Sequence, residues 1–466
     1  MDDSQGLWTA SRLAAAIRDR TISSRELLDL YVRRVERLNP SINAVVTLDL
    51  ERATEAAHAA DEATVAAPGG DELGPLHGLP ITVKDAIETA GIRSTGGATE
   101  LTGHVPDVDA PAVARLKSAG AVVFGKTNAP RWSGDIQTFN EQFGTTNNPW
   151  DLTRTPGGSS GGAAAAVSAG LTSFELGTDI GGSVRIPSHF CGVFGHKPSY
   201  GVVSQRGYLD HVGGGVIDAD INVFGPIARG AEDLDLLLGV LAGPDRELAT
   251  AWRLELPPPR HHDLAGYRVG LWLDDPAGEV AADMGDALSG AADALARAGA
   301  QVESVHPPLE LREAEQLFTA LILPAVSVST RRETGEQIGG SHRAWLDHHQ
   351  ARTVMRQVWA EWFRQYDVLL CPVMPMAAFP HDQRSELAER SVLINGRPRP
   401  HMATLAWTGL VGVVYLPSTV VPVGFTAGGL PVGIQVVGPY LEDRTSLLVA
   451  ARLAELVGGY VAPPGA

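Results

Sequence analysis

The sequence predicts an α/β fold in which helices cover a β-sheet in layers. Segments with helical spacing alternate with short β-branched runs along most of the chain, which is typical of that class. The length of 466 residues suits two or three domains, or one large α/β domain. Hydrophobic residues make up 44% and charged residues 20%, so the composition is that of a globular protein and excludes a disordered or fibrous chain.

The first 130 residues show this alternation. Ser23 and Glu26 form a capping box, and the helix that follows is expected to end at Asn39-Pro40. A strand ending in a lysine follows later, at Gly78 to Asp85. The further elements expected here are a helix at residues 51–66 that ends in a turn at residues 68–70, a helix at residues 112–118 and a strand at residues 121–124.

The second half of the chain repeats the pattern and ends in a charge-free stretch. Residues 267–305 are expected to form strand, helix and strand, and residues 310–366 to be helical. Residues 408–441 lack any charge, but four prolines and seven glycines exclude one continuous membrane-spanning helix. Two β-branched runs around a turn at residues 426–429 instead predict a hairpin of buried strands.

Charge and cysteine content exclude several classes of function. The net charge of −17 disfavours nucleic-acid binding, because phosphate contacts need lysine and arginine. Cys191 and Cys371 cannot build a disulfide framework or a four-ligand zinc site, and are expected to be buried thiols. The acidic start at Met1 is unlike a signal peptide, so we expect a cytoplasmic protein. We also expect it to need no membrane, metal or cofactor. A homodimer is compatible with this composition.

Two glycine-rich segments carry the candidate chemistry. Residues 155–162 contain Ser159, and residues 177–187, which follow an expected strand at residues 172–176, contain Ser183. Each serine lies just before a helical stretch whose free N–H groups can stabilise negative charge. A phosphate-binding loop is disfavoured because the Gly-Lys-Ser/Thr ending is missing. The pattern G-x-S-x-G also matches a nucleophile elbow, but residues 150–156 are polar and contain proline where that elbow needs a buried strand.

These segments resemble the amidase signature family. The resemblance rests on residues 78–85 (GLPITVKD), 157–162 (GGSSGG) and 177–185 (GTDIGGSVR), with Ser159 lying 75 positions after Lys84 and Ser183 another 24 positions on. It covers most of residues 5–240 and 365–455, whereas residues 245–365 vary within the family. The resemblance implies a single domain over residues 1–466, an α/β/α layered fold with a large central mixed β-sheet covered by helices.

The resemblance also implies a Ser-Ser-Lys triad. Ser183 would be the nucleophile, and Ser159 would pass its proton to Lys84, which must then be neutral. The peptide bond between Gly158 and Ser159 would be cis. An oxyanion hole, which also binds the substrate carbonyl, would be formed by four backbone N–H groups, those of Ile180, Gly181, Gly182 and Ser183.

Other residues receive supporting or structural roles. Asp179 and Arg185 are expected to brace the nucleophile loop, and Ser160 either hydrogen-bonds Lys84 or caps the helix that follows. Residues 132–138 lie where the family lines its acyl pocket. Asn128, at the end of a strand, is a second candidate for the pocket wall. The histidines are not expected to act as ligands or as a catalytic base; these are His196, His342, His348 and His349.

Two functions remain after a non-catalytic relative is set aside because the triad is intact. The first is a self-sufficient amidase acting on small or aryl amides, with esters and carbamates (urethanes) as further substrates. The tryptophan-rich residues 341–366, within the variable segment 245–365, are expected to give it an apolar entrance. The second is the glutaminase subunit of a tRNA-dependent amidotransferase that needs partner subunits. The loop after Tyr208 departs from what such subunits usually carry, so the sequence favours the first function.

Overall fold

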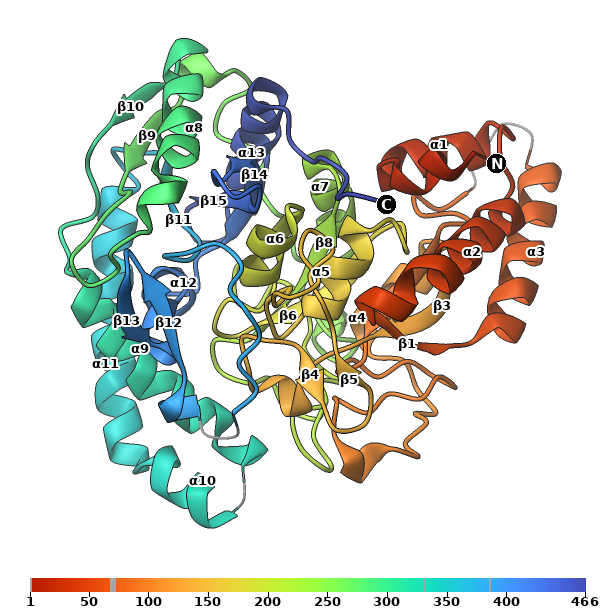
Figure 1. Cartoon of the computed structure of the whole chain (residues 1–466), viewed down its shortest axis with the longest axis horizontal. Coiled ribbons are helices and arrows are strands. Elements are labelled where there is room, and N and C mark those ends of the chain that lie inside the picture. Colours follow the sequence, from red (N-terminus) through yellow and green to blue (C-terminus); the bar gives the residue numbers. More distant parts are fainter. Residues whose placement is uncertain (1, 68–72, 331, 385–386) are drawn as a thin grey trace.

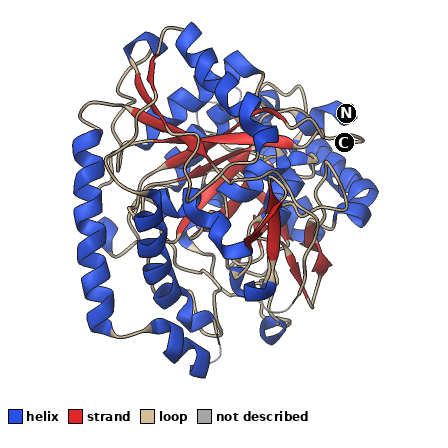
Figure 2. Ribbon diagram, turned by 60° about the vertical axis from the view of Figure 1, so that its left-hand side comes forward, coloured by secondary structure: helices blue, strands red, loops and turns tan. Residues whose placement is uncertain are grey.

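The computed structural model describes residues 2–67, 73–330, 332–384 and 387–466. Its centre is a mixed sheet of eight strands with helices on both faces (Figures 1 and 2). The strands lie in the order β10 (Gln301–Glu303), β9 (Arg268–Leu271), β11 (Val368–Pro372), β15 (Pro431–Val437), β14 (Ser418–Phe425), β7 (Phe194–Lys197), β8 (Val223–Ala228) and β6 (Glu175–Asp179). Strand β9 runs parallel to β10 and β11, and the other pairs are antiparallel. The expected layered fold with a large mixed sheet is therefore confirmed.

A second, three-stranded sheet lies beside β6 and carries the candidate lysine. Its order is β1 (Val45–Leu48), β3 (Val122–Thr127) and β2 (Pro80–Lys84), with β2 and β3 parallel. The backbone N–H of Thr82 on β2 donates to Thr172 Oγ1, just before β6. The helices beside this sheet are α1 (Ala10–Arg18), α2 (Ser24–Ile42), α3 (Leu50–Ala66) and α4 (Pro111–Ser118) (Figure 1).

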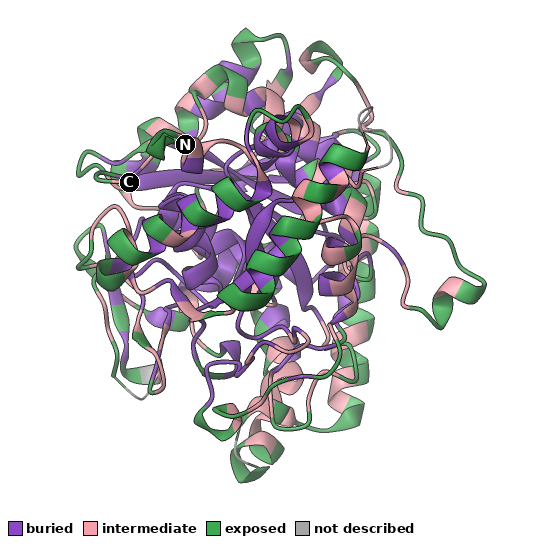
Figure 3. Cartoon of the chain, turned by 90° about the vertical axis from the view of Figure 1, so that its right-hand side faces the viewer, coloured by how far each residue is buried: buried purple, intermediate pink, exposed green. Residues whose placement is uncertain are grey.

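The central sheet separates two hydrophobic clusters because alternate residues of each strand face opposite sides. On β11, Val368 and Leu370 join one cluster, and Leu369 and Cys371 join the other. The first cluster contains residues of α5 (Gly161–Ser168), α7 (Ala231–Leu241), α8 (Gly285–Arg297) and α13 (Asp443–Val457). The second contains residues of α9 (Leu311–Val326), α11 (His342–Trp362) and α12 (Ala406–Gly412), while α6 (Arg185–Cys191) contributes to both. Figure 3 shows the buried strands enclosed by helices whose outer faces are exposed.

The second half of the chain matches the predictions. Strands β9 and β10 are parallel and joined by α8, as the strand–helix–strand pattern indicates. Residues 310–366 are mostly helical, with α10 (Arg332–Gly339) between α9 and α11. The charge-free stretch contains part of α12 and the antiparallel pair β14 and β15. Within the described residues, no helix is long and apolar enough to cross a membrane.

Three element boundaries were predicted wrongly. Helix α2 continues past Asn39-Pro40 to Ile42, because Pro40 lies in the last turn and the left-handed residue Asn43 ends the helix. Strand β3 extends to Thr127, because Gly125 to Thr127 pair with β1 and β2. The strand placed at residues 172–176 lies instead at Glu175–Asp179, where it pairs with β8. The turn at residues 68–70 that was expected to follow α3 lies outside the described residues.

Candidate active site

Lys84 lies at the end of β2 and is fully buried. Its Nζ lies 2.7 Å from Ser159 Oγ and 2.8 Å from Thr178 Oγ1. No carboxylate among the described residues forms an ion pair with it. Burial lowers the pKa of Lys84 to about 7, although the charges of Asp179 and Glu175 act to raise it. A neutral amine beside a serine hydroxyl is an arrangement that can accept the proton of that hydroxyl.

Ser159 is held by a tight turn before α5. The peptide bond between Gly158 and Ser159 is cis, as the resemblance implies. A Cβ on Gly158 would lie 2.6 Å from the carbonyl oxygens of Asp135 and Gln137, so only glycine fits against this neighbouring loop. Residues 152–160 contain no strand, and the nucleophile-elbow alternative therefore lacks the element it requires.

Ser183 lies in the loop between β6 and α6 and is 5% exposed. Within the described residues its Oγ forms no hydrogen bond, whereas its carbonyl accepts one from the N–H of Ser160 at 3.2 Å. The two serine-bearing turns are thus joined through the backbone. The direct contact between the hydroxyls of Ser159 and Ser183 that a proton relay needs is not among the hydrogen bonds of this structure.

The peptide between Gly181 and Gly182 is fixed at both ends. Thr408 Oγ1 donates to the carbonyl of Gly181 at 2.8 Å, and the N–H of Gly182 donates to Asp179 Oδ1 at 2.9 Å. Gly182 therefore does not offer a free N–H, which reduces the predicted set of four oxyanion donors to three. No described group accepts a hydrogen bond from the N–H of the other three residues, Ile180, Gly181 and Ser183.

A buried ion pair between Asp179 and Arg185 braces this loop. Asp179 accepts from Arg185 Nε at 3.0 Å and from Nη2 at 2.9 Å, and it also accepts from the backbone N–H groups of Gly182, Val184 and Arg185. Burial acts to raise the pKa of Asp179, but the Arg185 guanidinium holds it below its usual value. The carboxylate thus remains ionised and orients the whole turn.

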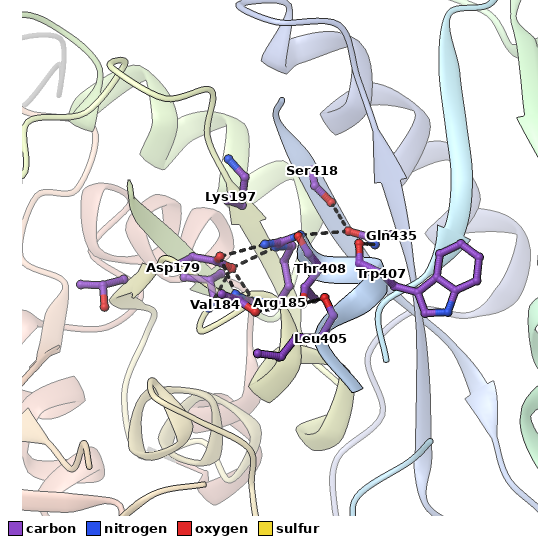
Figure 4. A network of polar contacts seen from close by, with 12 residues as sticks. Asp179, Val184, Arg185, Lys197, Leu405, Trp407, Thr408, Ser418 and Gln435 are labelled. Atoms are coloured by element: carbon purple, nitrogen blue, oxygen red, sulfur yellow. Dashed lines mark hydrogen bonds and ion pairs between the residues drawn. The ribbon is translucent and has the colours of Figure 1, made fainter. Parts of the chain in front are cut away.

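Arg185 also ties the loop to the C-terminal strands (Figure 4). Its Nη1 donates to the carbonyl of Thr408 at 3.0 Å and to Gln435 Oε1 at 3.3 Å. Gln435 in turn accepts from Ser418 Oγ and donates to the carbonyls of Pro372 and Trp407. Thr178, Thr408 and Gln435 were not predicted from the sequence. Thr178 lies in the block at residues 177–185, and the other two lie within residues 365–455, which the resemblance covers.

Ser160 does neither of the two things that the sequence left open. Its Oγ accepts from the N–H of Thr178 and donates to the carbonyl of the same residue, each at 3.2 Å. It makes no side-chain cap of α5 and no hydrogen bond to Lys84. Gly177 permits this contact, since a Cβ there would lie 2.8 Å from Ser160 Oγ. Ser160 therefore fastens α5 to β6.

Apolar side chains from α9 lie over the glycine-rich loop. A Cβ on Gly181 would lie 3.5 Å from Ile322 Cδ1, 3.6 Å from Phe318 Cζ and 3.9 Å from Leu405 Cδ1. Of the tryptophans of α11, which were expected to give an apolar entrance, Trp359 and Trp362 are buried in the second hydrophobic cluster, which also contains Phe318 and Leu405. Helical spacing alone does not distinguish a core face from a pocket wall, so the entrance role of these tryptophans stays a prediction.

The side chain of Asn128, the second candidate for the pocket wall, is held by its neighbours. Its side chain donates to the carbonyl of Gly144 and to Thr146 Oγ1, and it accepts from Asn140, so it fixes the β4–β5 turn (Phe139–Asn140 and Gly144–Thr145). In the neighbouring residues 132–138, Ile136 joins the second hydrophobic cluster, and Gln137 exchanges two hydrogen bonds with Asp382.

His196 and His349 have structural partners. His196 is buried between Thr419 Oγ1 and Asp443 Oδ1, and His349 accepts from Arg352 and stacks on Trp345. His342 and His348 lie on the same helix, α11. The described residues contain no group of three or more histidine, cysteine or acidic side chains placed to hold a metal ion.

Comparison with known proteins agrees with this geometry. The A subunit of glutamyl-tRNA(Gln) amidotransferase from Oleidesulfovibrio alaskensis is 32% identical, and the match covers 97% of both chains. A bacterial aryl acylamidase structure superimposes with a TM-score of 0.84 at 25% identity, covering 96% of both chains. The structure of the same amidotransferase component from Thermotoga maritima gives 0.75 at 27% identity, covering 94% of both. The Amidase family model matches residues 26–343 and 327–447, and the chain belongs to the amidase signature family.

Proposed function

We propose that this chain hydrolyses amides of small, uncharged or aryl substrates without a partner protein, through an acyl-enzyme on Ser183. The observation that carries the proposal is the fully buried Lys84 amine, 2.7 Å from Ser159 Oγ and without an ion-pair partner among the described residues. Such a lysine can be neutral near pH 7, which makes it a base for a serine hydroxyl.

The proposed reaction moves one proton along the triad. Ser183 Oγ attacks the substrate carbonyl and gives its proton to Ser159, whose own proton passes to Lys84. The tetrahedral oxyanion accepts hydrogen bonds from the free N–H groups of Ile180, Gly181 and Ser183. The proton on Lys84 then returns through Ser159 to the departing amine. Water attacks the acyl-enzyme by the same relay and releases the acid.

The substrate class follows from the side chains above the loop. Phe318, Ile322 and Leu405 present only apolar atoms to Gly181, which favours an uncharged group at this point. This contact also supports a role of the variable segment 245–365 in shaping the entrance, through α9. Esters and carbamates present the same trigonal carbonyl to Ser183. We propose both as further substrates, with carbamates slower because the alkoxy oxygen makes the carbonyl less electrophilic.

A second candidate is the glutaminase component of an amidotransferase. It is favoured by the curated sequence relatives, which carry the name of that amidotransferase's A subunit at 32% and 33% identity over nearly the whole chain. The same triad would then release ammonia from glutamine for a partner. The apolar contacts at Gly181 and the lower TM-score to the amidotransferase structure, 0.75 against 0.84 for the aryl acylamidase, support the first candidate.

The experiment that separates the candidates uses the purified chain with an acetanilide-type amide, an N-aryl carbamate and glutamine. We expect aniline from the amide, a slower release from the carbamate, and no ammonia from glutamine. The Ser183→Ala variant serves as the blank for each substrate. Ammonia from glutamine only after amidotransferase partner subunits are added, without hydrolysis of either aryl substrate, would establish the second candidate instead.

A further inference from the structure

A buried carboxyl group that the proposed mechanism does not use lies close to its base. Glu175 is the first residue of β6, three positions before Thr178, which bonds Lys84. Its Oε1 accepts from Thr127 Oγ1 at 2.8 Å, and its Oε2 accepts from the N–H of Leu176 at 2.9 Å. Thr127 lies directly opposite Lys84 in the register of β2 and β3. Glu175 is thus hydrogen-bonded to Thr127, the residue of β3 that lies opposite Lys84.

Glu175 forms no ion pair within the part of the chain that the structure describes. The side chain is fully buried, and no lysine, arginine or histidine there lies close enough to neutralise it directly. Burying an unpaired carboxylate is unfavourable, so burial raises the pKa of Glu175 to about 7. Burial lowers the pKa of Lys84 to the same range. The two groups therefore titrate over the same pH interval, and the ionised carboxylate favours the protonated amine.

The other charged groups around this pair are held by partners of their own. Asp179 on β6 also acts on Lys84, but it is bound by Arg185. Lys126, on the neighbouring strand β3, acts on Glu175 and is directed to the carbonyl of Ile87 and to Thr89 Oγ1.

Further groups lie along the adjoining strands. Asp85 follows Lys84 and accepts from Thr95 and Gly97. Lys197 of β7 donates to the carbonyl of Pro198. Strand β8, which pairs with β6, contributes no charged side chain.

We propose that Glu175 is a positioning residue for the reaction. Its carboxylate, which accepts a hydrogen bond from Thr127, stabilises the protonated form of the Lys84 amine. The consequence is a Lys84 amine that is a stronger base than burial alone would leave, and so better able to deprotonate Ser159. This inference rests on the proposed function, in which Lys84 is the base. A purely structural role, in which Glu175 only ties β6 to β3, is the alternative that the test must exclude.

The test compares Glu175→Gln with the wild type in the pH dependence of kcat/KM on an aryl amide. Glutamine keeps an oxygen that accepts from Thr127 but removes the charge. We expect the midpoint of the acidic limb to move to lower pH, with a lower plateau because the base is weaker. The matched control is Glu232→Gln on the exposed start of α7, which should leave the midpoint unchanged. A structural role would lower stability without moving the midpoint.

Thr127→Val provides a second arm that does not depend on the folding of Glu175→Gln. Without the Thr127 hydroxyl, ionised Glu175 loses a hydrogen bond and is protonated more readily. The midpoint should then move in the same direction by a smaller amount. Unchanged midpoints in both variants, or a shift to higher pH in either, would overturn the inference. Full activity of Lys84→Met would instead contradict the proposed function, in which Lys84 is the base. This result is distinct from one that contradicts only the role of Glu175.

Discussion

Ionisable residues are buried in the site between β2, α5 and β6, whereas those on the helical segment from α9 to α11 include exposed ion pairs. In the site, Lys84, Asp179 and Arg185 are buried, and their polar atoms are hydrogen-bonded by neighbours from other elements. On α10, Arg332 and Glu336 form an ion pair with side chains 91% and 67% exposed. The buried charges fix one geometry, whereas the exposed charges mainly keep a helix surface in water.

The largest effect is expected at the nucleophile of the buried site. Ser183→Ala should lower kcat on an aryl amide by about 10⁴-fold or more, because no other group can form the acyl-enzyme. Thermal unfolding should stay close to that of the wild type, since Ser183 Oγ forms no hydrogen bond among the described residues. Ser391→Ala, at an exposed position of strand β12 (Ser391–Ile394), is the matched control and should retain full activity. Comparable activity of the two variants would contradict the assignment.

The pH dependence of kcat/KM should report the protonation of Lys84. Because the pKa of Lys84 is lowered to about 7, the amine carries a proton below that pH and cannot accept one from Ser159. We expect kcat/KM to rise with pH and to level off in mildly alkaline buffer. A chelator should have no effect on the rate. A profile that is flat between pH 5 and 9, or activity abolished by chelation, would be inconsistent with this base.

The contrast between buried and exposed ion pairs can be measured directly. Arg185→Met leaves the Asp179 carboxylate buried without its cation, and we expect a loss of about 3–5 kcal/mol in the free energy of unfolding. Arg332→Ala breaks the exposed pair on α10 and should change the same quantity by about 0.5 kcal/mol at most. Denaturant unfolding of both variants provides the values. Equal losses in the free energy of unfolding of the two variants would contradict the difference between the buried and the exposed ion pair.

The smallest effect is expected where the two regions meet. Ile322→Ala removes an apolar contact above Gly181 and should lower kcat/KM for a bulky aryl amide by about 10-fold, with little change for acetamide. Leu323→Ala, one position along α9 on a more exposed side chain, is the control and should change neither substrate. If both variants lose activity equally on both substrates, α9 does not set specificity.

Local patterns in the sequence indicate the residues of the buried site more directly than the side-chain contacts of the helical segment, and the reason is physical. Lys84, Ser159 and Ser183 occupy short blocks in which glycines and a strand end leave few conformations, so the residues themselves indicate the geometry. The partners Thr408 and Gln435 come from more than 200 positions further along the chain. Such contacts depend on how the sheet is assembled, and no local pattern encodes them.

In the helical segment, the sequence predicts the helices but not the contacts of their side chains. Helical spacing predicted that residues 310–366 form helices, but it could not tell which apolar side chains face the core and which face a pocket. Phe318, Trp359 and Trp362 are all buried in the second hydrophobic cluster, and Phe318 also lies over the loop beside Ile322. Gly182 is a similar case, because the direction of its N–H depends on Asp179 and Thr408 rather than on the glycine-rich pattern.

Labelling with a serine-reactive fluorophosphonate tests the central claim most directly. The purified chain is treated with the probe and digested, and the modified peptide is identified by mass spectrometry, with Lys84→Met treated in parallel. We expect one label per chain, on Ser183, and much slower labelling of the Lys84→Met variant. A label on Ser159, or labelling of Ser183 at the same rate in both proteins, would contradict the proposed nucleophile and its base.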